Sequence, residues 1–328
     1  MKKQKRLLLT ILCLTVLVLL GYSSLNGSSP AFTDQLRQTA TVVEDQKGTL
    51  PSNPDSSNTG SGADIASVSG TLQVHFIDVG QADCILIKTP SGKTMLIDAG
   101  NNEDAETVTS YIEKQKISKL DIVVGTHPHE DHIGGLDAVI DTFKIGQVIM
   151  PGKTHTTKTF KDVLSAVKNK GLKITSAKTG ANLDLGDGMT AVVLAPNGSD
   201  YEDLNNYSAV IRIAFGSTSF LFTGDAGEVS ESEMLRNVSM YALKSTVLKV
   251  GHHGSGDATS EPFLDLVDPE YAMICVGKEN DYDHPAQETL DKLKNRGVKV
   301  FRTDLDGTIV AVSDGSEVTF HTLAITSK

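Results

Sequence analysis

The chain has 328 residues, of which 39% are hydrophobic, so it can bury a sizeable core in one large domain or two small ones. Its formal net charge is −11, and aromatic residues make up only 5% of it. An acidic body excludes broad electrostatic adhesion to nucleic acid or anionic lipid. A nucleic-acid substrate is still compatible with this charge, because bound divalent cations supply positive charge locally.

The first 22 residues are typical of an export signal. The segment Met1–Arg6 is basic, and Leu7–Leu20 carries no charge. That length suits a secretory signal and is short for a membrane-spanning helix of about 20 residues. No clear small-residue cleavage site follows, so a cleaved signal peptide and an uncleaved signal anchor both remain open. In either case we expect an extracellular or cell-surface protein whose N-terminal segment meets the membrane transiently or stays in it.

Residues 23–70 are rich in Ser, Asn, Gly and Pro, most clearly over Pro51–Gly62. Because such a segment has little to bury, it is expected to be a disordered linker. It would tether a single folded domain, residues 71–328, away from a membrane or wall.

The folded domain is expected to open with strands and a helix. Alternating or apolar runs predict strands over 72–78, 84–88 and 94–97. Asp98-Ala99-Gly100 ends the third strand. A helix over 103–116 and a buried strand over 120–125 follow.

The most informative stretch comes directly after that buried strand. It reads Thr126-His127-Pro128-His129-Glu130-Asp131-His132-Ile133-Gly134-Gly135 and precedes a helix expected over 136–143. On a strand-to-helix turn these side chains can converge on one point. Divalent zinc or manganese takes neutral imidazole nitrogens and carboxylate oxygens. A solvated polar turn is the plain alternative, but H-x-H-x-D-H favours metal ligands at His127, His129, Asp131 and His132.

This motif resembles the signature of the metallo-β-lactamase superfamily, most of whose members are metal-dependent hydrolases. The resemblance implies an α/β fold, a four-layer αββα sandwich with the metals at one edge of the sheets. It also implies that Asp98 supports the ligand turn by hydrogen bonds. Capping of the following helix is a second role for Asp98, and both roles can hold together.

The rest of the chain alternates between strands and helices, which favours layered sheets covered by helices. Lys249 is expected to be a solvated or structural strand residue. Cys84 and Cys275 lie in apolar runs, and buried free thiols are favoured there over a disulfide. The expected strands are 148–149, 173–175, 190–194, 209–215, 219–223, 248–250, 271–276, 298–302, 307–312 and 318–323, and the expected helices are 159–169, 227–237 and 286–296.

Two later strands end in further candidate ligands. Phe220–Asp225 is an apolar strand ending in an aspartate, and the resemblance implies that Asp225 bridges two metals. Seen alone, Asp225 could instead cap the helix over 227–237. Leu248–His253 is another strand ending in histidines, and the resemblance places His252 on the second metal. His253 is expected either to contact substrate or to pair with an acid behind the ligands.

The resemblance covers roughly residues 71–328 and narrows further. Asp78-Val79-Gly80-Gln81-Ala82-Asp83 together with Gly251-His252-His253-Gly254-Ser255 is similar to the hydrolase domain of ComEC/Rec2-type DNA-internalisation proteins, with Ala82 where that group has glycine. Here it is expected as a stand-alone, exported domain. By its place in this motif, Asp78 is taken as a support for the ligands.

One departure from the superfamily concerns a histidine that many members carry before the bridging aspartate. The segment Asp203–Ser208 has none, so Asn206 or Asn205 is expected to take its place, directly or through a water, with Ser208 in support. The first metal then has His127, His129 and Asp225. The second has Asp131, His132, Asp225 and His252. Fewer imidazoles at the first metal favour tolerance of manganese as well as zinc.

His284 is the candidate for a contact with substrate phosphate or for a general acid, against the alternative of an exposed loop histidine. His253 is a second candidate for stabilising developing negative charge. Asp131 is expected both to bind a metal and to orient the nucleophile.

These observations predict an exported dinuclear metal-dependent hydrolase that uses a metal-bridged hydroxide. The resemblance implies a phosphodiesterase or nuclease acting on extracellular DNA or another phosphodiester. The alternatives are a β-lactamase or thioesterase-type hydrolase and, in another class, a non-catalytic tethered metal-binding protein. No obligate protein partner is evident. Few aromatic residues predict no stacking platform for single strands.

Overall fold

Two β-sheets form the centre of the domain. The computed structural model describes residues 70–186 and 188–323, and all of them belong to one compact unit. The predicted signal, residues 1–22, and the predicted linker up to residue 69 lie outside the described residues. Within the described residues, no helix is long and apolar enough to cross a membrane.

The first sheet has the strand order β14-β13-β1-β2-β3-β4-β5-β6. Strands β14, β13, β1, β2 and β3 pair antiparallel, and β3 to β6 pair parallel. The strands are β1 Leu72–Phe76, β2 Ile85–Lys88, β3 Thr94–Ile97, β4 Lys119–Val124, β5 Lys144–Met150, β6 Ile174–Ser176, β13 Thr308–Ser313 and β14 Val318–Leu323.

The second sheet has the strand order β12-β11-β10-β9-β8-β7. Strands β9 to β12 pair parallel, and β7, β8 and β9 pair antiparallel. The strands are β7 Met189–Ala195, β8 Val210–Phe215, β9 Thr218–Phe222, β10 Val247–Lys249, β11 Tyr271–Ile274 and β12 Lys299–Arg302.

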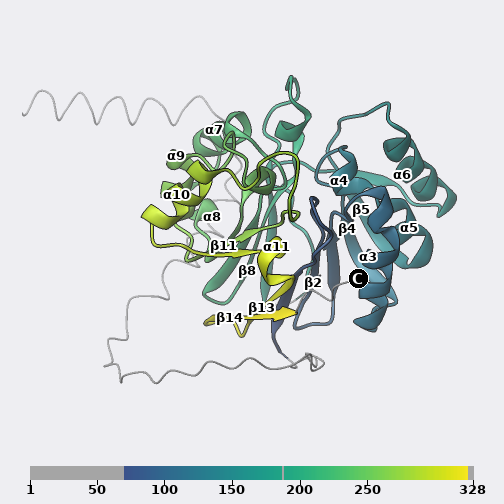
Figure 1. Ribbon diagram of the computed structural model, residues 1–328. Coiled ribbons are helices and arrows are strands. Elements are labelled where there is room, and N and C mark those ends of the chain that lie inside the picture. Colours follow the sequence, from purple (N-terminus) through teal and green to yellow (C-terminus); the bar gives the residue numbers. More distant parts are fainter. Residues whose placement is uncertain (1–69, 187, 324–328) are drawn as a thin grey trace, which may run out of the picture. The chain divides into compact units, whose positions relative to one another are not determined.

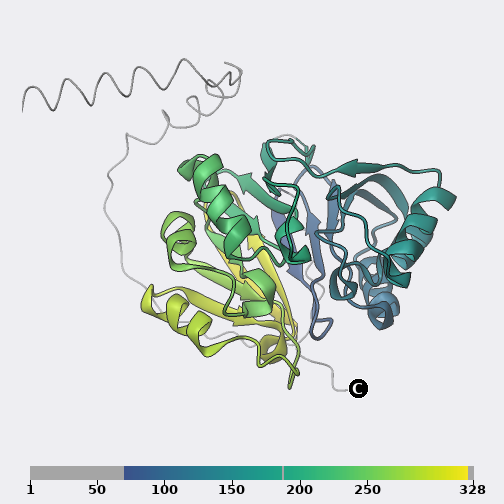
Figure 2. The same cartoon turned by 90° about the horizontal axis from the view of Figure 1, so that it is seen from above.

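The helices cover the two outer faces of the paired sheets (Figures 1 and 2). One apolar cluster fills the space between the sheets and includes Phe76, Ile211 and Phe222. A second joins the first sheet to its helices, and a third joins the second sheet to the others. The predicted αββα sandwich is therefore confirmed. Against the first sheet lie α3 Ala105–Lys114, α4 Glu130–Ile133, α5 Leu136–Thr142 and α6 Lys158–Asn169, and against the second α7 Glu228–Asn237, α8 Met240–Leu243, α9 Glu261–Val267 and α10 Gln287–Asn295.

Some elements differ from the sequence expectation. β5 is longer than the predicted strand 148–149. The prediction missed its first half because those residues are partly exposed and lack a clear apolar pattern. The helix α9 was not predicted. Its apolar side chains fall on one face, with Phe263, Leu264 and Val267 buried. The carboxylate of Glu231 accepts hydrogen bonds from the amide of Ser260 at 2.9 Å and from that of Thr259, which anchors the start of α9 from another helix. The short elements η1 Asn102–Asp104, η2 Leu204–Tyr207, η3 Gly251–Gly254 and α11 Thr303–Asp306 complete the described chain.

Loops after β3, β4, β9 and β10 bring the motif residues to one edge of the two sheets. β3 and β4 are parallel neighbours in one sheet, and β9 and β10 are parallel neighbours in the other. The Ala209 amide donates to the Thr126 carbonyl at 2.9 Å and so ties the two sheets together at this edge. Residues that are far apart in the sequence therefore meet here.

Candidate metal centre

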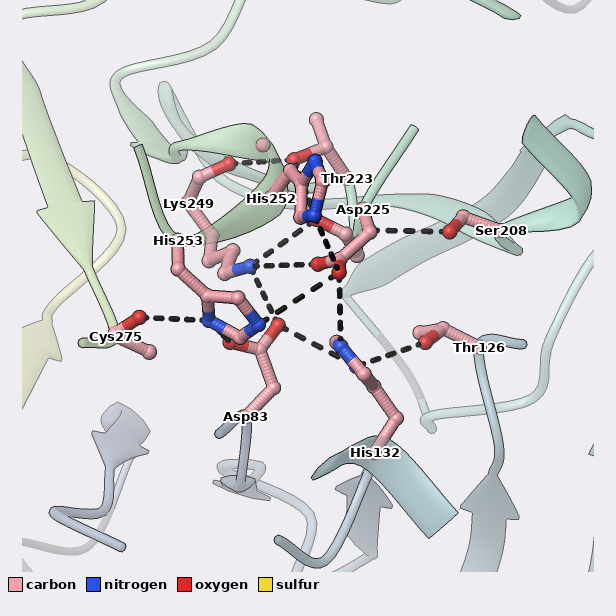
Figure 3. A network of polar contacts seen from close by, with 12 residues as sticks. Asp83, Thr126, His132, Ser208, Thr223, Asp225, Lys249, His252, His253 and Cys275 are labelled. Carbon is pink, nitrogen blue, oxygen red and sulfur yellow. Dashed lines mark hydrogen bonds and ion pairs between the residues drawn. The ribbon is translucent and has the colours of Figure 1, made fainter. Parts of the chain in front are cut away.

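Four imidazole nitrogens surround one carboxylate oxygen, Asp225 Oδ2. The distances from this oxygen to the Nε2 atoms are 3.1 Å for His132, 3.6 Å for His253, 3.8 Å for His252 and 3.9 Å for His127. Figure 3 shows three of these rings around Asp225. Asp225 therefore stands where a carboxylate that bridges two metals would stand.

The other ring nitrogen of each of these histidines has its own partner. His132 Nδ1 donates to Asp98 Oδ2 at 2.8 Å, and His253 Nδ1 donates to the Cys275 carbonyl at 2.9 Å. His252 Nδ1 lies 3.0 Å from Asp257 Oδ1, and His127 Nδ1 lies 3.4 Å from Ser208 Oγ. A proton held on Nδ1 leaves the Nε2 lone pair free, which is how histidines are prepared as metal ligands.

Two buried polar atoms inside the cluster lack hydrogen-bond partners among the described residues. His132 Nε2 and Asp225 Oδ1 have no hydrogen-bond partner among the described residues. A buried polar group left unsatisfied costs roughly 1–3 kcal/mol, so these atoms suit a cation better than an empty site. Asp131, His132, Asp225 and His253 each offer a ligand atom, and these atoms lie within 4.8 Å of one another. The residues present fit a divalent ion.

The two histidines after β10 lie at different places around Asp225. His253 Nε2 lies 3.2 Å from Asp131 Oδ2, so His253 joins Asp131 and His132 and pairs with an acid, one of the two places expected for it. His252 approaches Asp225 from the outer side and is the more exposed of the two, with 24% of its side chain accessible against 2%. Both residues have left-handed backbones, with φ of 49° and 52°, which turns the two rings to different sides of Asp225.

His127 and His129 lie together, as predicted. His127 Nε2 is 3.0 Å from His129 Nδ1, and the ring centroids are 4.7 Å apart. Burial lowers the pKa of His127 well below its ordinary value and also lowers the pKa of His129. Both rings are therefore held neutral, the form that a metal requires.

Asp98 lies where the motif places it. Its carboxylate accepts from the Thr126 amide at 2.8 Å, from the Thr126 hydroxyl at 2.7 Å and from His132 Nδ1. The glycine pair Gly134-Gly135 packs the ligand turn against the loop that follows β3 and carries Asp98. A Cβ on Gly134 would lie 2.2 Å from the carbonyl carbon of Asn101, so only glycine fits.

Asn206 does not take the place of the absent histidine. Its Oδ1 accepts from the Ser230 amide at 3.1 Å and so supports the first turn of α7. The neighbouring Asn205 points to the centre instead, with Nδ2 lying 3.3 Å from His252 Nε2. Asn205 Oδ1 is buried and has no hydrogen-bond partner among the described residues. Of the two alternatives, Asn205 is the one that the structure brings to the site.

Comparison with known proteins agrees with this geometry. A family model described as the metallo-beta-lactamase superfamily matches residues 77–278. The chain belongs to the metallo-β-lactamase superfamily.

Relatives within the superfamily include competence proteins, which confirms the expected ComEC/Rec2-type resemblance. ComE operon protein 3 of Bacillus subtilis (strain 168) is 32% identical over 254 residues, or 72% of this chain and 32% of that protein. Competence protein ComA of Neisseria gonorrhoeae is 30% identical over 235 residues, or 71% of this chain and 31% of that protein. The chain thus spans about a third of the length of these curated relatives.

A solved structure shows the same fold. The CmlA beta-hydroxylase E377D mutant superposes with a TM-score of 0.50 at 15% sequence identity, over 74% of this chain and 53% of that chain. At that identity, the likeness speaks for the metallo-β-lactamase fold alone.

A buried lysine and a second carboxylate complete the centre, and sequence analysis missed both roles. Lys249 Nζ lies 2.5 Å from Asp83 Oδ2, donates to the Gly224 carbonyl at 3.1 Å and lies 3.9 Å from Asp225 Oδ1 (Figure 3). Although burial lowers it, the charges of Asp83 and Asp225 raise the pKa of Lys249 above its ordinary value. Lys249 is therefore a charged interior residue, so of the two alternatives expected for it the structural one holds and the solvated one does not.

Asp83, and not Asp78, is the carboxylate of the first turn that reaches the centre. Asp83 Oδ1 lies 3.4 Å from His253 Nδ1. Asp78 Oδ1 instead accepts from the Gly80 amide at 3.2 Å, within its own turn. The side-chain contacts of Asp78 with described residues include no candidate ligand, so the structure does not bring Asp78 itself to the centre. The signal for Asp83 was present at the end of the same motif.

His284 lies at the outer rim of the centre. Its ring centroid is 5.5 Å from that of His252, with the rings edge to face. Gln81 Nε2 lies 3.4 Å from His284 Nδ1, and Gln81 Oε1 accepts from the Gly277 amide at 2.9 Å. With Nδ1 accepting this bond, His284 Nε2 carries the proton and can donate it in a hydrogen bond to a substrate.

A hollow of about 370 Å³ is lined in part by Lys178, Pro196 and Tyr207. Tyr207 lines it, and the next residue, Ser208, contacts both His127 and the Asp225 amide. The basic groups here are Lys178, which lines the hollow and is exposed, and Lys153, whose Nζ donates to the Tyr207 hydroxyl at 3.2 Å. Neither lysine has an ion-pair partner among the described residues.

Proposed function

We propose that this protein is an exported metal-dependent phosphodiesterase that acts on extracellular DNA or on another phosphodiester outside the cell. The observation that carries the proposal is the set of Nε2 atoms around Asp225 Oδ2, each with Nδ1 already engaged. Such a set holds metal ions through neutral imidazoles and a shared carboxylate. Membership of the superfamily supports metal-dependent hydrolysis, and the likeness to competence proteins supports a nucleic-acid substrate.

Two divalent ions, zinc or manganese, would supply Lewis acidity and lower the pKa of a water between them toward neutrality. Asp131, His132, His253 and Asp225 would hold one ion. His127, His129 and Asp225 would hold the other, with the amide of Asn205 nearby. The second set has one protein ligand fewer and lacks the additional histidine that many superfamily members carry, which favours acceptance of manganese.

Asp131 is a ligand that meets solvent, with 32% of its side chain accessible. Burial works against its ionisation, but the neighbouring His132 and His253 outweigh burial and hold the pKa of Asp131 below its ordinary range. Asp131 is therefore a carboxylate at working pH, able to orient an attacking water. His284 Nε2 is placed to donate a hydrogen bond to a phosphoryl oxygen.

Two lysines at the hollow, Lys178 in its lining and Lys153 next to Tyr207, support an anionic substrate. In a chain with a net charge of −11, Lys153 and Lys178 stand without acidic partners among the described residues, next to the catalytic edge. A polyanion that entered along this hollow would have its charge partly neutralised near His127.

An accessible Asp131 also argues against a non-catalytic metal-binding protein. Structural zinc sites are closed, usually by four protein ligands.

The export part of the proposal rests on the basic and apolar segments of residues 1–22, with residues 23–70 as tether and the membrane as the partner of the N-terminus. Cell fractionation with protease treatment of intact cells tests it, since a surface protein is digested and an internal one is not.

The activity is tested with the full chain, loaded with manganese or zinc and assayed on bis(p-nitrophenyl) phosphate, single- and double-stranded DNA, a cephalosporin and a thioester. We expect the phosphodiesters to be hydrolysed and His127→Ala and Asp131→Ala to abolish turnover. Hydrolysis of the small diester without DNA cleavage would remove the nuclease claim. Turnover of the cephalosporin or thioester alone would overturn the phosphodiesterase proposal.

A further inference from the structure

Two stacked rings, the exposed Tyr282 and the half-buried His284, lie between solvent and the metal centre. The Tyr282 ring stacks on His284, with centroids 5.7 Å apart and an interplanar angle of 27°. His284 in turn meets His252 edge to face at 5.5 Å. Tyr282 is 68% exposed, so one face is covered by His284 and the other is open. The rings of Tyr282, His284 and His252 therefore form a row that ends beside Asp225.

The loop that carries this pair is braced without any ligand. Asn280 Oδ1 accepts from the Tyr282 amide at 3.1 Å and from the His284 amide at 3.0 Å. Asn280 Nδ2 donates to the Gly277 carbonyl at 3.0 Å and to the His284 carbonyl at 2.6 Å. Gln81 ties the same loop to the first motif turn. An aromatic surface held in advance loses little freedom when it binds a partner.

The charges around Tyr282 indicate which force would hold a ligand on its ring. The residues on either side of it, Asp281 and Asp283, are acidic and exposed. They repel a polyanion, so affinity at this point comes from the ring face and not from charge. Flat aromatic faces bind nucleobases by stacking, which is tolerant of sequence because every base has a π-face.

We propose that Tyr282 and His284 form a stacking platform for a nucleobase, so that a base of the substrate lies on the open face of Tyr282 while a phosphodiester farther along the same strand lies at the metal centre. The platform makes the site selective for diesters that carry bases over diesters that do not. This inference rests on the proposed phosphodiesterase function. It also replaces the expectation that the chain offers no stacking surface.

The test compares an oligothymidylate with an abasic oligomer of equal length and charge. With the full chain and manganese, we expect the KM for the abasic oligomer to be about tenfold higher. Tyr282→Leu raises the KM for oligothymidylate by about the same factor and leaves the abasic KM unchanged. Tyr282→Phe keeps the ring face and the wild-type KM. The Tyr282→Leu effect is equal at low and high salt, because stacking and not charge is lost.

Equal KM values for the two oligomers in the wild type would overturn the platform, as would equal losses in Tyr282→Leu and Tyr282→Phe. Binding of the two labelled oligomers to the Asp131→Asn variant, measured by fluorescence anisotropy, separates this inference from the proposed function. Base-dependent binding that Tyr282→Leu removes supports the platform even if no oligomer is cleaved. Base-independent binding overturns the platform even if both oligomers are cleaved.

Discussion

Lys249 Nζ lies 2.5 Å from Asp83 Oδ2, and both side chains are buried beside Asp225. The ammonium also approaches Asp225 Oδ1 at 3.9 Å. A permanent cation at this place eases the repulsion among the carboxylates of the metal centre. It is part of the protein itself and does not depend on bound metal.

Lys249→Met is therefore expected to leave Asp83 as an uncompensated buried charge. The expected loss is about 3–5 kcal/mol in the free energy of unfolding, measured by urea denaturation of the metal-free protein. The double variant Lys249→Met/Asp83→Asn should recover part of that loss, because no charge is then stranded. A double variant less stable than Lys249→Met would show that the ion pair is not what Lys249 provides.

Asp98→Asn should weaken metal binding by about 10- to 100-fold, because His132 loses the carboxylate that orients its ring. The measurement is a competition titration with a chelating dye. Asp78→Asn is the matched control, since the Asp78 carboxylate contacts the Gly80 amide of its own turn. Equal effects of the two substitutions would contradict the assignment of Asp98 and restore the earlier expectation for Asp78.

Substitution of Asn205 should affect the metal centre, whereas substitution of Asn206 should affect stability. Asn206→Ala removes an acceptor of the Ser230 amide, so we expect a loss of about 1 kcal/mol in unfolding free energy and a nearly normal kcat. Asn205→Ala should lower kcat or metal content with little change in stability, because its amide faces His252. The reverse pattern would return Asn206 to the site.

His75 should make stability depend on pH below neutrality. Burial, aided by the charge of Lys88, lowers the pKa of His75 to about 3, and its Nδ1 is 2.8 Å from the Tyr111 hydroxyl. The unfolded chain binds a proton below about pH 6.5 and the folded chain does not, so stability is complete above that pH and is lost as the pH falls from 6.5 toward 3.

The slope attributable to His75 grows as the pH falls through 6.5 and approaches about 1.4 kcal/mol per pH unit near pH 5. It is measured from urea denaturation in chelator between pH 7.5 and 5, which removes the pH dependence of metal binding. The variant His75→Leu/Tyr111→Phe removes both partners and should flatten the slope by that amount. An unchanged slope would show that another group carries the pH dependence.

The local motif predicted much of the site, because its signals lie within a few residues of one another. His127, His129 and His132 follow one strand, and Asp225 ends another. The layered order of the sheets came with the family resemblance, since periodicity alone cannot say which strands pair. The helix α9 was missed because its start is anchored by Glu231, a residue distant in the sequence.

The remaining site residues depend on contacts that no local pattern reveals. Lys249 is charged and lies in an apolar run, and only the arrival of Asp83 from the first turn explains its burial. His252 and His253 are adjacent in sequence, yet left-handed backbones send their rings to different sides of Asp225. Tyr282 became informative only when the structure placed it on His284.

The most direct test of the account is the number of manganese or zinc ions bound per chain, measured by elemental mass spectrometry after dialysis. We expect two ions in the wild type, one in His253→Ala, which leaves the His127/His129 ligands in place, and fewer than one in Asp225→Ala, which removes the shared carboxylate. Fewer than one ion in the wild type, or two ions retained by Asp225→Ala, would contradict a metal centre built around Asp225.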